Sequence, residues 1–273
     1  MPVVAAAFAL VSRVAFASAS EIRVDLVLSW SDFVSGERVR CVVDVANSSP
    51  EKISVGYRDS KDLLFVEVYK AGDMTQLDRV ARKPFVARFS LESGEGQKLE
   101  TFLGDHYDLR ETRRYLAKPV LVHGGCRYEG APRAFDIVDG VKVAGAMQMF
   151  ATRKGLQREF SVVYWSRNHS EHVFLKAADS GTSSRKWETR DLGAILRLEP
   201  PTISILPTGE VVVLHRLNQD QFIRSEFWSL TDALEFRMRE TVQDPETAGT
   251  ARVRELYREG GVKPKQNPWW KFW

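Results

Sequence analysis

The sequence predicts an all-β protein, and three observations lead to that fold class. Apolar and polar residues alternate with a period of two through most of the chain, as in strands with one buried face. Turn residues such as glycine, proline and asparagine separate these short segments at regular spacing. The composition, 44% hydrophobic and 27% charged over 273 residues, is that of a folded globular chain with room for two domains.

The clearest predicted strand covers residues 38–47. Gly36 precedes it, and the turn residues 47–50 follow it. We expect it to organise a first β-sandwich, with its neighbours packed on both sides. Its apolar face consists of Val39, Cys41, Val43 and Val45.

The first half of the chain holds further predicted strands and one predicted hairpin. Gly124 and Gly125 form the kind of two-residue loop that closes a hairpin. Pro119 predicts that the strand before this loop is an edge strand or is bulged. The strands are expected at 22–30, 53–57, 63–69, 85–89, 98–103, 115–123, 126–129 and 134–138.

This strand pattern resembles an immunoglobulin- or fibronectin-III-like β-sandwich, over a domain of residues 21–140. The resemblance rests on several short strands with turn signals between them. It implies the fold alone, because sandwiches of this kind serve many unrelated functions.

A second β domain is predicted at 148–243, after a link at 141–157. Its hairpins resemble blades of a β-propeller, but about 90 residues are too few for a closed ring. A small open sheet or barrel, a sheet packed on the first domain, and a ring completed by other chains are the alternatives, and we favour the packed sheet. Its strands are expected at 160–165, 171–177, 186–192, 202–206, 210–216, 221–228 and 234–240.

Residues 1–19 predict a signal peptide, and therefore a secreted or periplasmic protein. An apolar run at 3–12 is followed by the small residues Ala17 and Ala19, which fit a cleavage site. The alternatives are a downstream translation start or a disordered leader. The run is too short for a transmembrane helix, and no later segment is long enough.

Cys41 and Cys126 are the two cysteines of the chain. An exported protein meets an oxidising compartment, where the two could form a disulfide. Such a bridge would close a loop of 85 residues, worth about 4–5 kcal/mol in the chain-entropy model. Two unpaired, buried thiols are the equal alternative.

The last 30 residues, 244–273, predict a short helix followed by an aromatic tail. Asp244 and Pro245 fit the start of a helix, and Gly260 fits its end. The tail is expected either to fold into a groove on its own chain or to bind a protein partner, a cell-surface component or a membrane interface. The predicted binding residues are Trp269, Trp270, Phe272 and Trp273.

The candidate catalytic groups form no coherent active site. His169 and His172 flank a tight turn with Glu171 and are expected to be exposed turn residues rather than metal ligands. His123 beside Cys126 suggests a thiolate–imidazole pair, but a hairpin shields such a pair poorly, so a structural role is expected. Phosphate-binding loops and nucleophile elbows are absent from the sequence, and no cofactor is predicted.

These observations predict a non-catalytic binding protein rather than an enzyme. The net charge of +3 is spread over 39 basic and 36 acidic residues, which argues against nucleic acid as a partner. The alternative is a hydrolase or carbohydrate-active protein with a site between the two β domains. Its candidate residues are Asp105, His169, His172 and His215.

Overall fold

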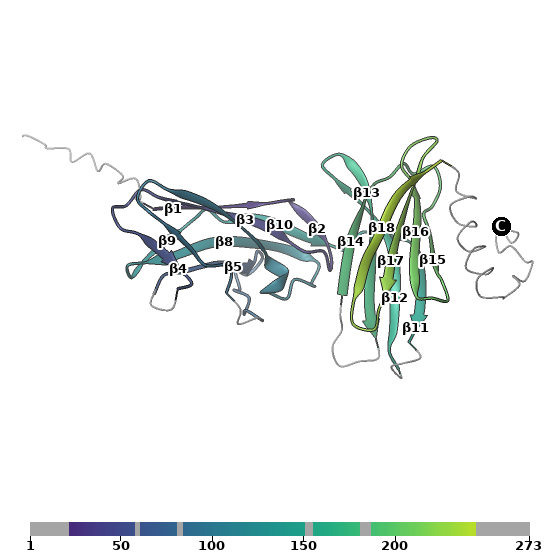
Figure 1. Cartoon of the computed structure of the whole chain (residues 1–273), viewed down its shortest axis with the longest axis horizontal. Helices are drawn as coiled ribbons and strands as arrows, with labels where there is room; N and C mark the ends of the chain where they lie inside the picture. The colour runs from purple at the N-terminus through teal and green to yellow at the C-terminus, as the bar shows by residue number, and fades with distance from the viewer. Residues whose placement is uncertain (1–21, 58–60, 81–83, 151–154, 181–186, 244–273) are drawn as a thin grey trace, which may run out of the picture.

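The computed structural model describes residues 22–57, 61–80, 84–150, 155–180 and 187–243, and these form eighteen strands and one 3-10 turn (Figure 1). The all-β prediction is therefore confirmed. The predicted signal peptide and the predicted C-terminal helix and aromatic tail lie outside the described residues. The sheets of β1 to β10 and those of β11 to β18 each have their own apolar core, and we call them the first and the second domain.

The first domain is built from three sheets, in the strand orders β1-β3-β7, β2-β10-β8-β5 with β9 on β8, and β4-β6. β2 and β10 pair in parallel, whereas the other pairs are antiparallel. The elements are β1 (Ile22–Leu28), β2 (Asp32–Val34), β3 (Arg40–Asn47), β4 (Ile53–Val55), β5 (Leu63–Lys70), β6 (Phe89–Leu91), β7 (Gly96–Phe102), η1 (Leu103–Asp105), β8 (Arg113–His123), β9 (Cys126–Glu129) and β10 (Arg133–Val138).

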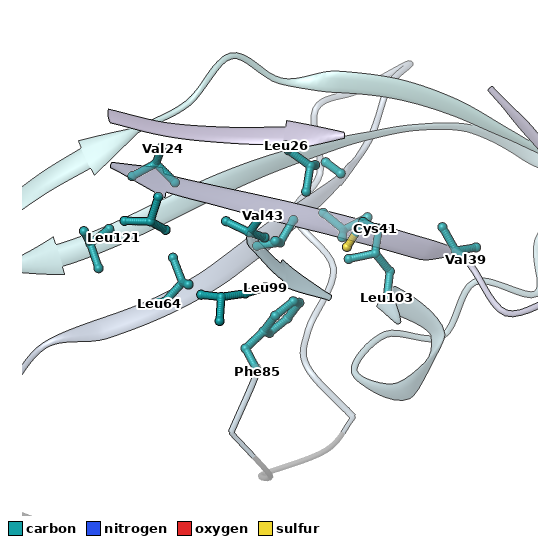
Figure 2. Packing of buried hydrophobic residues seen from close by; sticks show 14 of the residues in the cluster. Val24, Leu26, Val39, Cys41, Val43, Leu64, Phe85, Leu99, Leu103 and Leu121 are labelled. Carbon is teal, nitrogen blue, oxygen red and sulfur yellow. The ribbon is translucent and has the colours of Figure 1, made fainter. Parts of the chain in front are cut away.

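β3 occupies the centre of its sheet, as the alternation of residues 38–47 predicted. Val39, Cys41, Val43 and Val45 are all fully buried, with 0% exposure. Figure 2 shows three of these side chains, from Val39, Cys41 and Val43, among the core residues of the facing elements. The coarse prediction of a β-sandwich is thus confirmed for this part of the chain.

Strand β8 lies inside its sheet, so the prediction that Pro119 marks an edge strand is wrong. Up to Ala117 the strand pairs with β10, and from Val120 it pairs with β9. Pro119 lies where the partner changes, and there its carbonyl accepts a bond from the Gly130 amide at 3.0 Å. The missing proline N–H therefore falls in a gap between two ladders.

Gly130 brings the end of β9 against β1 and so helps to close the two main sheets together. A Cβ atom at this position would overlap the backbone oxygen of Val24 and the ring of Pro119. A backbone oxygen cannot move aside as a flexible side chain can. The position therefore requires glycine.

The second domain consists of two four-stranded antiparallel meanders, β11-β12-β13-β14 and β15-β16-β17-β18, which enclose a common core. Part of the predicted link is strand β11, which has small residues and a bulge between Lys142 and Ala144 that obscure its alternation. The elements are β11 (Val141–Met149), β12 (Gln157–Arg167), β13 (Ser170–Ser180), β14 (Trp187–Ala194), β15 (Thr202–Ile205), β16 (Glu210–Arg216), β17 (Phe222–Ser229) and β18 (Leu234–Val242).

The two domains meet where β2 and the turn after it contact the second domain, as the close approach of β2 to β13 and β14 in Figure 1 shows. The Thr189 hydroxyl donates to the Ser35 carbonyl at 2.7 Å, and the Trp165 indole donates to Asp32 at 2.8 Å. The Arg167 guanidinium forms two bonds to the Glu37 carboxylate, at 2.6 and 3.0 Å. Polar contacts thus hold the two domains together at an interface that buries only a small apolar cluster.

Candidate functional site

The candidate site begins with the two-stranded ribbon of β4 and β6 in the first domain. Ser54 lies opposite Ser90 in this ribbon. The residues on either side of them are buried in the core, so alternation directs both serines to the opposite face. The buried neighbours are Ile53, Val55, Phe89 and Leu91.

His123 closes one side of the site at the end of β8. Gly124 and Gly125 both have positive φ, 58° and 80°, and turn the chain directly after the histidine. The His123 Nδ1 lies 2.9 Å from Asp62 Oδ2, and the same oxygen accepts a bond from the Ser54 amide at 2.9 Å. The Asp62 carboxylate therefore fixes the orientation of the imidazole ring.

The other ring nitrogen of His123, Nε2, is buried and makes no hydrogen bond to the described residues. Its nearest charged neighbour is the Glu51 carboxylate, at 3.7 Å, which is beyond hydrogen-bond distance. The histidine side chain is only 9% exposed, whereas that of Glu51 is 75% exposed. A buried polar atom without a partner needs a physical explanation, and a ligand group is one.

These side chains surround an open groove of about 700 Å³. Sites for small molecules are typically about 300–1,000 Å³, so the size fits one. Lys52 pairs with Glu92 at 2.5 Å, whereas Lys61 has no carboxylate within salt-bridge distance in the described part of the chain. The groove is lined by Lys52, Ser54, Tyr57, Lys61, Asp62, Ser90, His123 and Gly124.

A second, much smaller cavity of about 30 Å³ lies beside Arg158 in the second domain. Arg158 forms a buried, two-bond ion pair with Asp179, at 2.6 and 3.1 Å. The guanidinium also donates to Ser229 and to the carbonyls of Leu230 and Ala233. Since the arginine is held from several directions and the space has the size of one water molecule, this cluster is structural.

The four residues proposed for a site between the domains do not form one. Asp105 belongs to η1 in the first domain and pairs with Arg38 at 3.3 Å. His169 is exposed in the β12–β13 turn, where it has a positive φ of 62°. His172 lies 3.1 Å from Asp191, which is itself paired with Arg167. His172 contacts Asp191, and the charge of Asp191 also acts on the buried His215.

Burial decides the protonation of His215. Its ring lies in the second domain with 1% exposure, and neither ring nitrogen makes a well-formed hydrogen bond to the described residues. Burial, followed by the positive charge of Arg239, lowers its pKa from 6.5 to about 4, against weaker opposing contributions from Ala194 and Asp191. The imidazole is therefore neutral at neutral pH.

The sequence left open whether the two cysteines form a disulfide. In this structure both thiols are free. Cys41 is buried in the β3 core, and burial raises the pKa of its thiol to about 12. Cys126 is exposed beyond the Gly-Gly turn. The His123 ring contacts Asp62 through Nδ1.

Most residues of the groove were not predicted from the sequence. Asp62 and His123 are 61 positions apart, and nothing local to either predicts their contact. The one available signal was the alternation of 53–57, which places Ser54 opposite the apolar face of a short strand. The missed residues are Lys52, Ser54, Tyr57, Lys61, Asp62 and Ser90.

Among the residues that the structure describes, no group of three or more His, Cys, Asp or Glu side chains could hold a metal ion. The same residues include no helix with the length and apolar character needed to cross a bilayer.

Comparison with known proteins gives a structural likeness but no sequence relative. No protein-family model matches the chain, and no curated protein matches it. Among solved structures, the chain is similar to the crystal structure of Spo0M, a sporulation control protein from Bacillus subtilis. The match has 10% identity and a TM-score of 0.31, and it covers 88% of this chain and 97% of that one. A likeness of this size carries no inference about function.

Proposed function

We propose that this chain is a non-catalytic binding protein that holds a small ligand in the groove beside His123. One observation carries the proposal: the buried Nε2 atom of His123 has no hydrogen-bond partner among the described residues, and His123 lines a groove of ligand size. Desolvating a polar atom without a partner costs about 1–3 kcal/mol. A ligand that bonds to this nitrogen would recover that cost.

The geometry favours binding over catalysis. A nucleophile activated by histidine lies within about 2.6–3.2 Å of the ring nitrogen, although this distance is often longer without substrate. Ser54 and Ser90 both line the groove, yet no hydroxyl in the described structure forms a hydrogen bond with His123 Nε2.

Thermal unfolding of the full chain with a panel of small acids, phosphates, sugars and amines tests this proposal. We expect at least one class of compound to raise the Tm of the wild type, because a ligand that binds only the folded state stabilises it. The substitution Ser90→Phe fills the groove and should abolish that shift. Ser204→Phe, at an exposed position on β15, is the matched control and should retain it. A panel without any Ser90-dependent shift would refute the proposal.

A hydrolase is the second candidate, and the Asp62–His123 pair is the observation that favours it. A carboxylate bonded to Nδ1 orients a histidine so that Nε2 can accept a proton as a general base. Turnover of ester, phosphoester or glycoside substrates, lost in His123→Gln and strongly reduced in Asp62→Asn, would support this candidate over simple binding. Turnover that survives both substitutions would eliminate it.

The remaining parts of the proposal concern location and partners. Residues 1–19 support export to the periplasm or the medium, and N-terminal sequencing of protein recovered from those fractions would test it. The aromatic residues Trp269, Trp270, Phe272 and Trp273 are proposed to bind a protein or cell-surface partner, and they lie outside the described residues. An immunoglobulin- or fibronectin-III-like topology for residues 22–140 is also a proposal, supported by the number and spacing of the strands.

A further inference from the structure

We infer that the groove beside His123 binds the anionic oxygen atoms of a small phosphate- or carboxylate-bearing molecule. This inference rests on the proposed ligand-binding function and specifies its chemistry. Three features support it: the donors that line the groove, the bonds made by the Asp62 carboxylate, and the free Nε2 atom of His123.

Most polar groups of the lining are hydrogen-bond donors. Lys52 and Lys61 each supply an ammonium group, and Ser54, Ser90 and Tyr57 supply hydroxyls. Lys61 has no carboxylate in salt-bridge range among the described residues. Ammonium and hydroxyl donors together match the several acceptor oxygens of a phosphate or carboxylate.

Among the described lining residues, the one carboxylate, that of Asp62, is already engaged. Asp62 Oδ2 is bonded to His123 Nδ1 and to the Ser54 amide, both at 2.9 Å. Its side chain is 13% exposed, so it presents little negative surface to the groove. An anionic ligand therefore meets mainly donors there.

The free nitrogen of His123 needs a donor from the ligand. Nδ1 faces the Asp62 carboxylate, which only accepts, so Nδ1 carries the N–H and Nε2 of the neutral ring is an acceptor. A hydrogen phosphate ion or a hydroxy acid has both an O–H group that can donate to Nε2 and anionic oxygen atoms that can accept from lysine. The Glu51 carboxylate lies 3.7 Å from Nε2 and is 75% exposed, so its negative charge opposes an anion in the groove.

Titration calorimetry on the full chain tests the inference, with inorganic phosphate and citrate as probes and sodium chloride keeping the ionic strength constant. We expect at least one of the two anions to bind. Lys61→Gln should weaken that binding about fivefold or more, because it removes one cation. Lys98→Gln, an exposed lysine on β7 outside the groove lining, is the matched control and should leave binding unchanged.

Glu51→Gln gives a second result with the opposite sign. Removing the negative charge of Glu51 near the groove should tighten anion binding about threefold. A purely structural role for Glu51 would weaken binding or leave it unchanged.

The arms of the experiment separate the two proposals. If glycerol or glucose binds in a Ser90→Phe-sensitive way while phosphate and citrate do not bind, the groove is a ligand site but the anion inference is wrong. Equal effects of Lys61→Gln and Lys98→Gln would also overturn it. If no member of the wider panel binds, the proposed function itself fails.

Discussion

Replacing Arg167 by methionine should destabilise the protein strongly, because this arginine is the central ionic contact between the domains. Its side chain is 1% exposed, and that of its partner Glu37 is 12% exposed. The guanidinium also donates to the Asp32 carbonyl at 3.1 Å and to Asp191 at 3.3 Å. Methionine would leave the carboxylates of Glu37 and Asp191 without this cation.

The expected loss follows from the burial of this pair. Removing one partner of a buried ion pair costs about 3–5 kcal/mol, because the other charge stays desolvated and unpaired. The Arg167 guanidinium also lies 4.8 Å from the Trp30 ring centroid and 5.1 Å from that of Phe174, and these contacts would be lost too. We therefore expect Arg167→Met to lower the free energy of unfolding by about 3–5 kcal/mol.

Urea unfolding followed by circular dichroism and by tryptophan fluorescence measures this loss. Arg114→Met is the matched control, because Arg114 forms a similar two-bond pair with Asp136, at 2.9 Å, but its side chain is 65% exposed. That variant should lose about 1 kcal/mol or less. The double substitution Arg167→Met with Glu37→Gln should recover part of the loss, since it removes a stranded charge. Equal costs for Arg167→Met and Arg114→Met would refute the reasoning.

Three further predictions concern His215, Gly130 and the two cysteines. His215 has a pKa of about 4 when folded and 6.5 as a free side chain, so the unfolded state binds more protons between these values, and stability should fall by about 3 kcal/mol as the pH drops from 6.5 to 4. In urea unfolding at several pH values, His215→Gln should remove that part of the slope, and an unchanged slope would contradict the assignment. Gly130→Ala should cost at least about 2 kcal/mol in the same assay, because its Cβ would overlap a backbone oxygen, whereas Gly104→Ala, with open space around it, should be nearly neutral. A thiol reagent should modify Cys126 at once and Cys41 only in denaturant, and two fast thiols, or none, would disagree with the structure.

The sequence predicted those parts of the fold that depend on neighbouring residues. Alternation in 38–47 identified the β3 core because the pattern and the burial have the same period. Gly124 and Gly125 identified the hairpin because both positions need positive φ, which glycine adopts without strain. These features are encoded locally, and the structure confirms them.

Features that depend on distant contacts were not predictable in the same way. A strand was expected at 85–89, but β6 begins at Phe89. The start of β6 is set by its pairing with β4, which lies more than thirty residues earlier in the chain. The groove depends on that pairing and on the contact of Asp62 with His123 across 61 positions. A single sequence contains no local pattern for either contact.

Charged residues on strands were the other source of error, and they also explain why the groove differs from the rest of the protein. Arg224 and Glu226 are buried on β17 at positions where alternation alone predicts solvent, and they pair with each other. Arg167 is likewise a buried charge on a strand, and its terminal nitrogen atoms form ion pairs. Within the described residues, these charges are paired in the same chain, although the Nε atoms of Arg167 and Arg224 make no hydrogen bond there. His123 Nε2 is also buried without a hydrogen-bond partner among the described residues, and His123 lines a groove. Ion pairs explain the burial of the first group, and a ligand in the adjoining groove is the explanation that we propose for His123.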